Sequence, residues 1–152
     1  MANEPAPKSE YPMKISTYVG MVHPVATLQS GKVKANFSDS YNVGLPIGIN
    51  FQKSAKVGLS FEIAPNITAT DSIAKVQSFL LHPGVFFPLN KGWRVTKRIA
   101  YDSNGRFGFT PSVSKVLLQG NQTLSLTMPF PFRFGNGQAA SMGTAVLLTY
   151  SM

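Results

Sequence analysis

The stretch that decides the fold is residues 41–52, Tyr-Asn-Val-Gly-Leu-Pro-Ile-Gly-Ile-Asn-Phe-Gln. Its side chains alternate between two kinds over the whole length. One face is large and apolar, and consists of Tyr41, Val43, Leu45, Ile47, Ile49 and Phe51. The other face holds only glycine, proline, asparagine and glutamine. Because successive side chains of a β-strand point to opposite faces, this period of two predicts a long, two-faced strand.

The same alternation recurs along the chain and predicts eight strands. They cover residues 13–28, 41–52, 57–66, 78–89, 93–102, 107–118, 123–134 and 141–152. Polar or glycine-rich connections separate them, and their lengths alternate: long loops are expected at 29–40 and 67–77, and tight turns at 53–56 and 90–92. Helical spacing is not sustained anywhere, so the chain is expected to be all-β.

Composition excludes several classes of function. The chain has 152 residues, which suits one domain, with no Cys and only two His. A disulfide framework, a Cys nucleophile and a thiolate metal site are therefore excluded, and neither a metal nor a cofactor is expected. The formal net charge of +8 allows an anionic partner. No nucleic-acid-binding motif is present and the basic residues do not share one strand face, so nucleic acid is not the expected partner.

The chemistry of the two strand faces favours a membrane protein. In a soluble sandwich the polar face meets water and is rich in charged residues. Here that face is mostly Gly, Ser, Asn, Thr and Pro, which suits a crowded lumen. A tilted transmembrane strand needs about 9–11 residues, which these strands supply. We therefore expect an eight-stranded antiparallel up-and-down transmembrane β-barrel, with both termini on the tight-turn, periplasmic side.

The first residues suggest how such a chain is processed. Residues 1–10 have no apolar signal core and predict a disordered leader before a single domain at 11–152. For an outer-membrane location, this predicts a mature form from which a signal peptide has been removed.

Several short stretches resemble a known family. They are Val22-His23-Pro24, Asn36-Phe37-Ser38-Asp39, Val43-Gly44-Leu45-Pro46-Ile47-Gly48, Phe61-Glu62-Ile63-Ala64-Pro65, His82-Pro83-Gly84-Val85-Phe86-Phe87, Gly108-Phe109-Thr110-Pro111 and Pro131-Phe132-Arg133-Phe134-Gly135. Over about residues 11–152 the chain is similar to small eight-stranded outer-membrane β-barrels, and most like uncharacterised Bacteroidota outer membrane beta-barrel proteins. The resemblance implies the outer membrane of a Gram-negative bacterium and no catalytic role. The chain departs from it at Tyr150-Ser151-Met152, because such proteins usually end on an aromatic residue.

Charged side chains on the inward face predict a polar plug in the lumen. They are Lys14, Glu62, Arg94, Arg98, Asp102 and Arg133. An eight-stranded barrel is just wide enough for side chains to fill, so charges inside it must be paired. Counted from the tight-turn end, Glu62 lies level with Arg98, and Asp102 with Arg133, which predicts two ion pairs. The alternative is a gate or a narrow, porin-like ion path.

Two further sets of residues are expected at the barrel ends. Cations in the long-loop connections, which could bind lipopolysaccharide phosphates, are Lys32, Lys34, Lys75 and Arg106. Aromatic residues expected to form girdles at the two membrane interfaces are Tyr41, Phe51, Phe87, Trp93, Tyr101, Phe107, Phe134 and Tyr150. Lys97 does not fit, because it falls on the apolar face near mid-membrane; a β-bulge would turn it inward.

The expected function is structural or interactive, without enzyme activity. The barrel would be monomeric, with outer-membrane lipid or lipopolysaccharide, or other envelope proteins, as partners. One alternative is a soluble all-β module, such as a lipocalin-like carrier or a self-assembling capsid or fibre subunit. Another is a lipid-modifying barrel enzyme that uses His82 with Ser60 or Ser78, although no hydrolase motif surrounds this histidine.

Overall fold

In a computed structural model of the chain, which describes residues 11–38 and 40–152, the fold is all-β and contains no α-helix. The strands are β1 (Lys14–Gln29), β2 (Lys32–Ala35), β3 (Tyr41–Gly44), β4 (Ile47–Gln52), β5 (Gly58–Ala69), β6 (Ala74–Pro88), β7 (Trp93–Asp102), β8 (Phe107–Gln119), β9 (Thr123–Pro129), β10 (Phe132–Phe134) and β11 (Ser141–Ser151). A single 3-10 turn, η1 (Asn90–Gly92), joins β6 to β7. Within the described ranges, no helix is long and apolar enough to cross a membrane. The expected leader, residues 1–10, lies outside the described residues.

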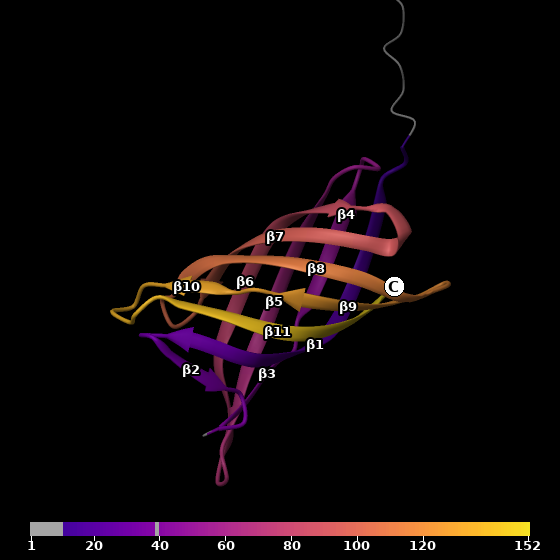
Figure 1. Cartoon of the computed structure of the whole chain (residues 1–152). Coiled ribbons are helices and arrows are strands. Elements are labelled where there is room, and N and C mark those ends of the chain that lie inside the picture. The colour runs from indigo at the N-terminus through magenta and orange to yellow at the C-terminus, as the bar shows by residue number, and fades with distance from the viewer. Residues whose placement is uncertain (1–10, 39) are drawn as a thin grey trace, which may run out of the picture.

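The strands form one antiparallel sheet that closes into a ring (Figure 1). β3 and β4 both pair with β1 and β5, the strands β5 to β8 pair in chain order, and β9 and β10 both pair with β8 and β11. β1 pairs with β11 to close the circle, from Tyr18 opposite Ser151 to Gln29 opposite Ser141. A register shift between Pro24 and Ala26 bends β1 in the middle of this seam. The all-β, antiparallel character expected from the period of two is confirmed.

Eleven strands are present where eight are expected, because two of the eight are interrupted at a proline and one short strand is added. Residues 41–52 become β3 and β4, and residues 123–134 become β9 and β10. Proline has no N–H to donate to the ladder. Its carbonyl still accepts, since Gly20 N donates to Pro46 O and Gly143 N donates to Pro131 O, each at 2.8 Å. Eight runs of chain therefore still follow one another around the ring.

The predicted long loops are wrong in detail. The loop expected at 67–77 is mostly strand, because the β5–β6 ladder continues to the pair Ala69–Ala74 and leaves a four-residue turn at 70–73. This hairpin projects at the bottom of Figure 1. The loop expected at 29–40 contains β2, which pairs with the end of β1. We call the end of the ring with these hairpins and the connections 103–106 and 135–140 the loop end.

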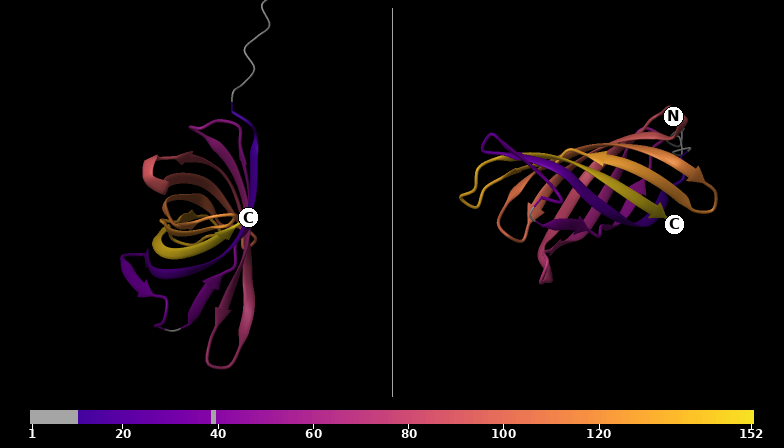
Figure 2. Two further views of the ribbon diagram at one scale, coloured as in Figure 1. Left: turned by 90° about the vertical axis from the view of Figure 1, so that its right-hand side faces the viewer. Right: turned by 60° about the horizontal axis from the view of Figure 1, so that its bottom comes forward.

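The opposite end carries the connections 53–57, 89–92 and 120–122, the start of β1 and the C-terminus, and we call it the turn end (Figure 2). There Thr17 and Met152 exchange backbone hydrogen bonds of 3.1 and 2.9 Å. These bonds hold the start of β1 to the last residue of the chain.

The ring is apolar outside and polar inside. Large apolar side chains on every strand run remain exposed, for example Ile47 (57%), Leu81 (51%) and Phe109 (48%). The buried positions are mainly hydroxyl, amide and charged groups: Asn36, Asn50, Ser60, Glu62, Ser78, His82, Thr96, Thr110, Ser112, Thr127 and Ser141. The buried apolar cluster consists of Ala64, Leu80 and Ala100. Globular proteins in water have the reverse arrangement, with apolar residues inside.

Two inward aromatic rings lie over glycines of the neighbouring strand. Tyr18 on β1 lies opposite Gly48 on β4, and Phe86 on β6 lies opposite Gly58 on β5. A Cβ atom at either glycine would lie 2.2 Å from the ring atoms of its partner. The interior therefore holds these two large rings because the facing positions have no side chain.

Gly58→Ala is expected to lower the free energy of unfolding by about 1–3 kcal/mol, because the added methyl group overpacks against Phe86, which is 1% exposed. Urea unfolding followed by the fluorescence of Trp93, the only tryptophan, measures the change. Gly120→Ala is the matched control, since its Cβ would meet only Gln122 O at 3.9 Å. Equal stability of the two variants would contradict the tight contact between Phe86 and Gly58.

Candidate functional site

The candidate site is a buried polar cluster in the middle of the ring, formed by one row of cross-strand neighbours. Tyr18 lies opposite Gly48, Gly48 opposite Glu62, and Glu62 opposite His82. Because Gly48 has no side chain, the Tyr18 ring extends across β4 and its hydroxyl reaches Glu62. On the other side Ala100, Gly108 and Arg133 continue in register, so small residues again leave room for a long side chain.

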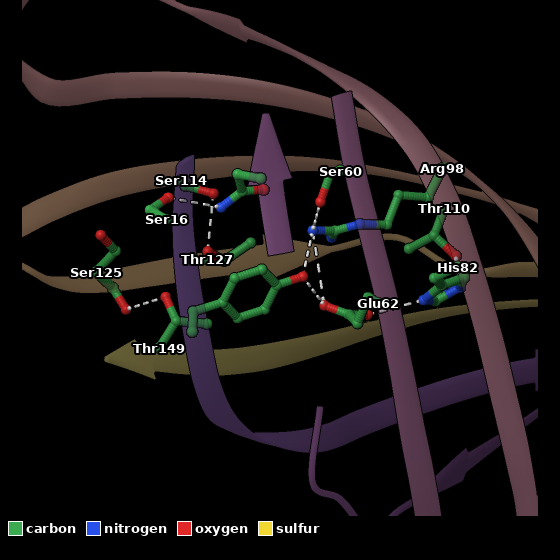
Figure 3. A network of polar contacts seen from close by, with 12 residues as sticks. Ser16, Ser60, Glu62, His82, Arg98, Thr110, Ser114, Ser125, Thr127 and Thr149 are labelled. Atoms are coloured by element: carbon green, nitrogen blue, oxygen red, sulfur yellow. Dashed lines mark hydrogen bonds and ion pairs between the residues drawn. The ribbon is translucent and has the colours of Figure 1, made fainter. Parts of the chain in front are cut away.

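Glu62 is the centre of this cluster and is 5% exposed. Tyr18 Oη donates to Glu62 Oε2 at 2.7 Å, and His82 Nδ1 lies 2.9 Å from Glu62 Oε1. Arg98 Nη2 lies 3.6 Å from Glu62 Oε2 and donates to Tyr18 Oη and Ser60 Oγ at 2.9 and 3.0 Å (Figure 3). A buried carboxylate is tolerated when it is both paired and hydrogen-bonded, as it is here. Glu62 and Arg98 are one of the two pairs expected from the sequence.

The neighbours of His82 define which ring nitrogen carries its proton. Nε2 lies 3.2 Å from Arg133 Nη2 and 3.2 Å from Thr110 Oγ1. Because a guanidinium can only donate, Nε2 acts as an acceptor and Nδ1–H donates to Glu62. The order carboxylate, imidazole, hydroxyl is that of a catalytic relay.

The Thr110 hydroxyl is buried and is held within the network by a second hydrogen bond. Thr110 is 4% exposed, and its Oγ1 accepts a further bond of 3.0 Å from Arg133 Nη1. The serines considered from sequence contact other groups, since Ser60 binds Arg98 and Ser78 donates to Asp102. His82 contacts neither serine, so the contact on which the enzyme alternative depends is not formed.

The second ion pair expected from sequence, between Asp102 and Arg133, does not form. The Asp102 carboxylate accepts from Ser78 Oγ at 3.0 Å and from the backbone N–H of Asn104 at 2.8 Å, which stabilises the turn after β7. The Arg133 guanidinium instead donates to Thr110 and to the carbonyls of Phe109 and Phe132. No carboxylate of the described residues lies within 4 Å of it.

Two other predicted lumen charges have different surroundings. Lys14, at the start of β1, is exposed, and its ammonium lies 5.3 Å from the centroid of the Tyr11 ring. Its placement in the lumen network is therefore wrong, because β1 begins at the rim of the ring. Arg94 faces inward and stacks on Phe86, with its guanidinium carbon 4.6 Å from the ring centroid.

The interior contains two chambers. The turn-side chamber has a volume of about 170 Å³ and a polar lining that includes Ser16, Asn50, Arg94, Ser114, Ser125 and Thr149. The loop-side chamber has a volume of about 390 Å³ and includes Asp102, Arg106 and Arg133 in its lining. The residues that line both are Glu62, Arg98, Thr127 and Leu147. These four, with Tyr18 and His82, lie between the two chambers, and we call the six residues the partition.

The loop-end cations divide into two kinds. Lys32 and Lys34 on β2 and Lys75 on β6 are exposed. Arg106 turns inward instead, and its Nη2 donates to Arg133 O, Ala139 O and Ser141 Oγ at 3.1 to 3.2 Å. Arg106 thus ties the connection 135–140 to the end of β10.

The aromatic residues expected at interfaces lie near the two ends of the ring. Near the turn end are Phe51, Phe87, Trp93 and Tyr150, and near the loop end are Tyr41, Tyr101, Phe107 and Phe134. Phe109 stacks on Phe132 with ring centroids 4.6 Å apart. Tyr41 Oη is hydrogen-bonded to His23 Nδ1 at 2.7 Å, a contact that the sequence pattern does not indicate.

Lys97 points outward and is exposed. Its register is unbroken on both sides, with Val85 opposite on β6 and Pro111 opposite on β8. The bulge that would have turned it inward is therefore absent, and a single cation lies among apolar side chains halfway along β7.

Within the described residues, no group of three or more His, Cys, Asp or Glu side chains could hold a metal ion. In comparisons with protein families, with curated proteins and with solved structures, nothing matches this chain.

Glu62→Ala is expected to destabilise the fold by about 3–5 kcal/mol, because it leaves the Arg98 charge and the Tyr18 hydroxyl without their buried acceptor. The double variant Glu62→Ala/Arg98→Ala is expected to lose less than the sum of the single variants, since it removes both charges. Urea unfolding of the four chains in a double-mutant cycle measures the coupling.

The control is Lys14→Ala, which removes an exposed charge and is expected to change stability by less than about 0.5 kcal/mol. Strict additivity of the Glu62 and Arg98 substitutions would disprove the energetic link between them.

Proposed function

We propose that the chain is a bacterial outer-membrane protein whose ring is an eight-stranded up-and-down transmembrane β-barrel. Its role is structural or interactive, and it has no enzyme activity. The turn end lies in the periplasm, and the loop end faces the exterior. The resemblance to Bacteroidota outer-membrane barrels remains a prediction that agrees with this proposal.

The apolar belt around the ring is the observation that carries the proposal. Every strand run presents large exposed apolar side chains, including Val19, Ile47, Leu59, Phe61, Leu81, Ile99, Phe109, Met128, Val146 and Leu148. Closure of the sheet leaves no strand edge in the belt, as lipid requires. Aromatic residues flank the belt near both ends, as in transmembrane barrels. Hydrocarbon covers such a surface without a specific partner.

The partition supports a closed barrel rather than a pore. Glu62, Arg98 and Tyr18 hold one another across the interior with bonds of 2.7 and 2.9 Å and the ion pair of 3.6 Å. Opening a path would separate a buried carboxylate from its cation, at a cost of several kcal/mol. We therefore propose that the barrel does not conduct in its resting state.

The lysines of the loop end supply the contact with the outer leaflet. Lys32, Lys34 and Lys75 are exposed at the hairpins that project beyond the belt. Ammonium groups there can pair with the phosphates of lipopolysaccharide or of another anionic lipid. We propose these lipids as the surroundings of the barrel, which is monomeric.

A soluble, self-assembling module is the rival function. It needs other copies of the chain to cover the belt, because a surface this apolar is not stable in water. A lipocalin-like carrier fits less well, since its apolar residues would line the interior and here they point outward.

Refolding from urea is expected to need detergent micelles or lipid vesicles. The unheated protein should then migrate differently from the boiled protein on an SDS gel, because a closed barrel resists SDS until it is heated. Samples diluted into plain buffer should show no such difference. Folding in buffer without detergent would overturn the membrane proposal and favour the self-assembling module.

Lys97→Leu is expected to stabilise the protein in lipid vesicles by about 2–4 kcal/mol, because a lysine near the bilayer midplane carries a cost of that size. Lys53→Leu, in a turn-end connection, is the matched control and is expected to change stability little. Urea titration in vesicles measures both. Equal effects of the two substitutions would place Lys97 outside the hydrocarbon.

A further inference from the structure

We propose that the loop-side chamber binds a small amphiphilic monoanion, with its acidic head on Arg133 and Arg106 and its apolar body against the chamber wall. The site belongs to the ring itself and does not depend on insertion into a membrane, so it is separable from the proposed function.

The wall of the chamber is the first observation. Its lining includes Pro46, Ala64, Leu80, Pro129, Ala145 and Leu147, all apolar. The turn-side chamber, in contrast, is lined mainly by hydroxyl and amide groups. The volume of about 390 Å³ lies within the range of about 300–1,000 Å³ typical of small-molecule sites. The lining extends from the partition to exposed Gln77 near the loop end, so a ligand can enter from that side.

The charge of the lining is the second observation. Glu62 and Arg98 compensate each other through their contact of 3.6 Å. The lining has one further acid, Asp102, and two further cations, Arg106 and Arg133. One positive charge is therefore left without a counter-ion in the lining. A ligand with one negative charge would balance it.

The two guanidiniums have no carboxylate partner among the described residues. Arg133 donates to neutral oxygens and contacts His82. Arg106 donates to two carbonyls and to Ser141 Oγ, and its buried Nε has no partner. Both side chains line the loop-side chamber, and Arg106 Nη2 also donates to the backbone carbonyl of Arg133 at 3.1 Å.

These features define the class of ligand. A carboxylate or a phosphate diester carries one negative charge and accepts charge-assisted bonds from guanidinium groups. A compact apolar body gains from leaving water for the apolar wall. A neutral apolar molecule would leave the positive charge uncompensated, and a strongly polar anion would gain nothing from the wall.

Isothermal titration calorimetry of the folded chain in a non-ionic detergent tests the site, with titrations into protein-free micelles subtracted. The probes are 3-phenylpropanoate, methyl phenyl phosphate and the neutral 3-phenylpropanol. We expect at least one of the two anions to bind at one site per chain, more weakly as salt rises, and about tenfold or more tightly than the alcohol. The preferred anion shows whether the head is a carboxylate or a phosphate.

Two variants locate the site. Arg133→Gln removes the charge and is expected to weaken the bound anion about tenfold or more. Ala145→Leu fills the chamber with the charges kept and is expected to abolish binding. Thr149→Leu, in the turn-side chamber, is the control and should bind as the wild type does. The mobility of unheated samples on SDS gels reports whether each variant has folded. If only one of Arg133→Gln and Ala145→Leu folds, that variant alone decides the test.

Three outcomes would overturn the proposal. They are no binding of either anion to the folded chain, equal binding of anion and alcohol, or unchanged affinity in a folded Arg133→Gln or Ala145→Leu variant. Failure of the chain to insert into vesicles would overturn the proposed function and leave this result unaffected.

Discussion

The narrow interior of the closed ring is the constraint on which the rest of the structure depends. Each strand must send every second side chain into a narrow space, which these side chains fill except for the two chambers. Where Tyr18 and Phe86 point inward, the facing residues are Gly48 and Gly58, and a single added carbon atom would lie 2.2 Å from each ring. The inward face is therefore limited to small residues, and the few large ones occupy places that glycine leaves open. Most of the large apolar side chains have no room inside and face outward.

The same limit explains how a carboxylate, an imidazole and two guanidiniums share the interior. Glu62 contacts Tyr18, His82 and Arg98 at the same time because each of them extends into the interior from a different strand. Arg133 reaches the far side of His82 because Ala100 and Gly108 lie between them in the row. With one carboxylate at the centre, the cations nearer the loop end remain without an acid of their own.

The strands and their faces could be predicted from the sequence because alternation is a local property. The range of β7, Trp93–Asp102, matches the expected segment 93–102, and the contact of Glu62 with Arg98 follows from counting along two strands. The breaks at Pro46 and Pro131 could have been anticipated, since a proline removes a ladder donor. The inward Tyr18 is also visible in the sequence, as an aromatic residue on a face of small ones.

Other features depend on side-chain reach and register, which alternation does not determine. Counting residues from the turn end places Asp102 level with Arg133, yet Asp102 stabilises its own turn and Arg133 extends toward His82. Arg106 lies in a short polar connection, where sequence alone predicts a side chain in solvent. It turns inward because it donates to Ala139 O in the 135–140 connection, whose position the sequence does not indicate. The polar residues between 67 and 77 resemble a loop, but strand pairing continues through them.

The seam between β1 and β11 has a consequence for how the chain acquires its fold. Because Tyr18 pairs with Ser151, one edge of β1 stays uncovered until β11 has been synthesised. Contacts so distant in sequence require the loss of loop-closure entropy before any stabilising pairing forms, and this slows folding. Until the C-terminal strand is complete, both margins of the growing sheet are free to pair with other chains. Folding is therefore expected to finish in one late step, with the unfinished chain dependent on protection from aggregation until then.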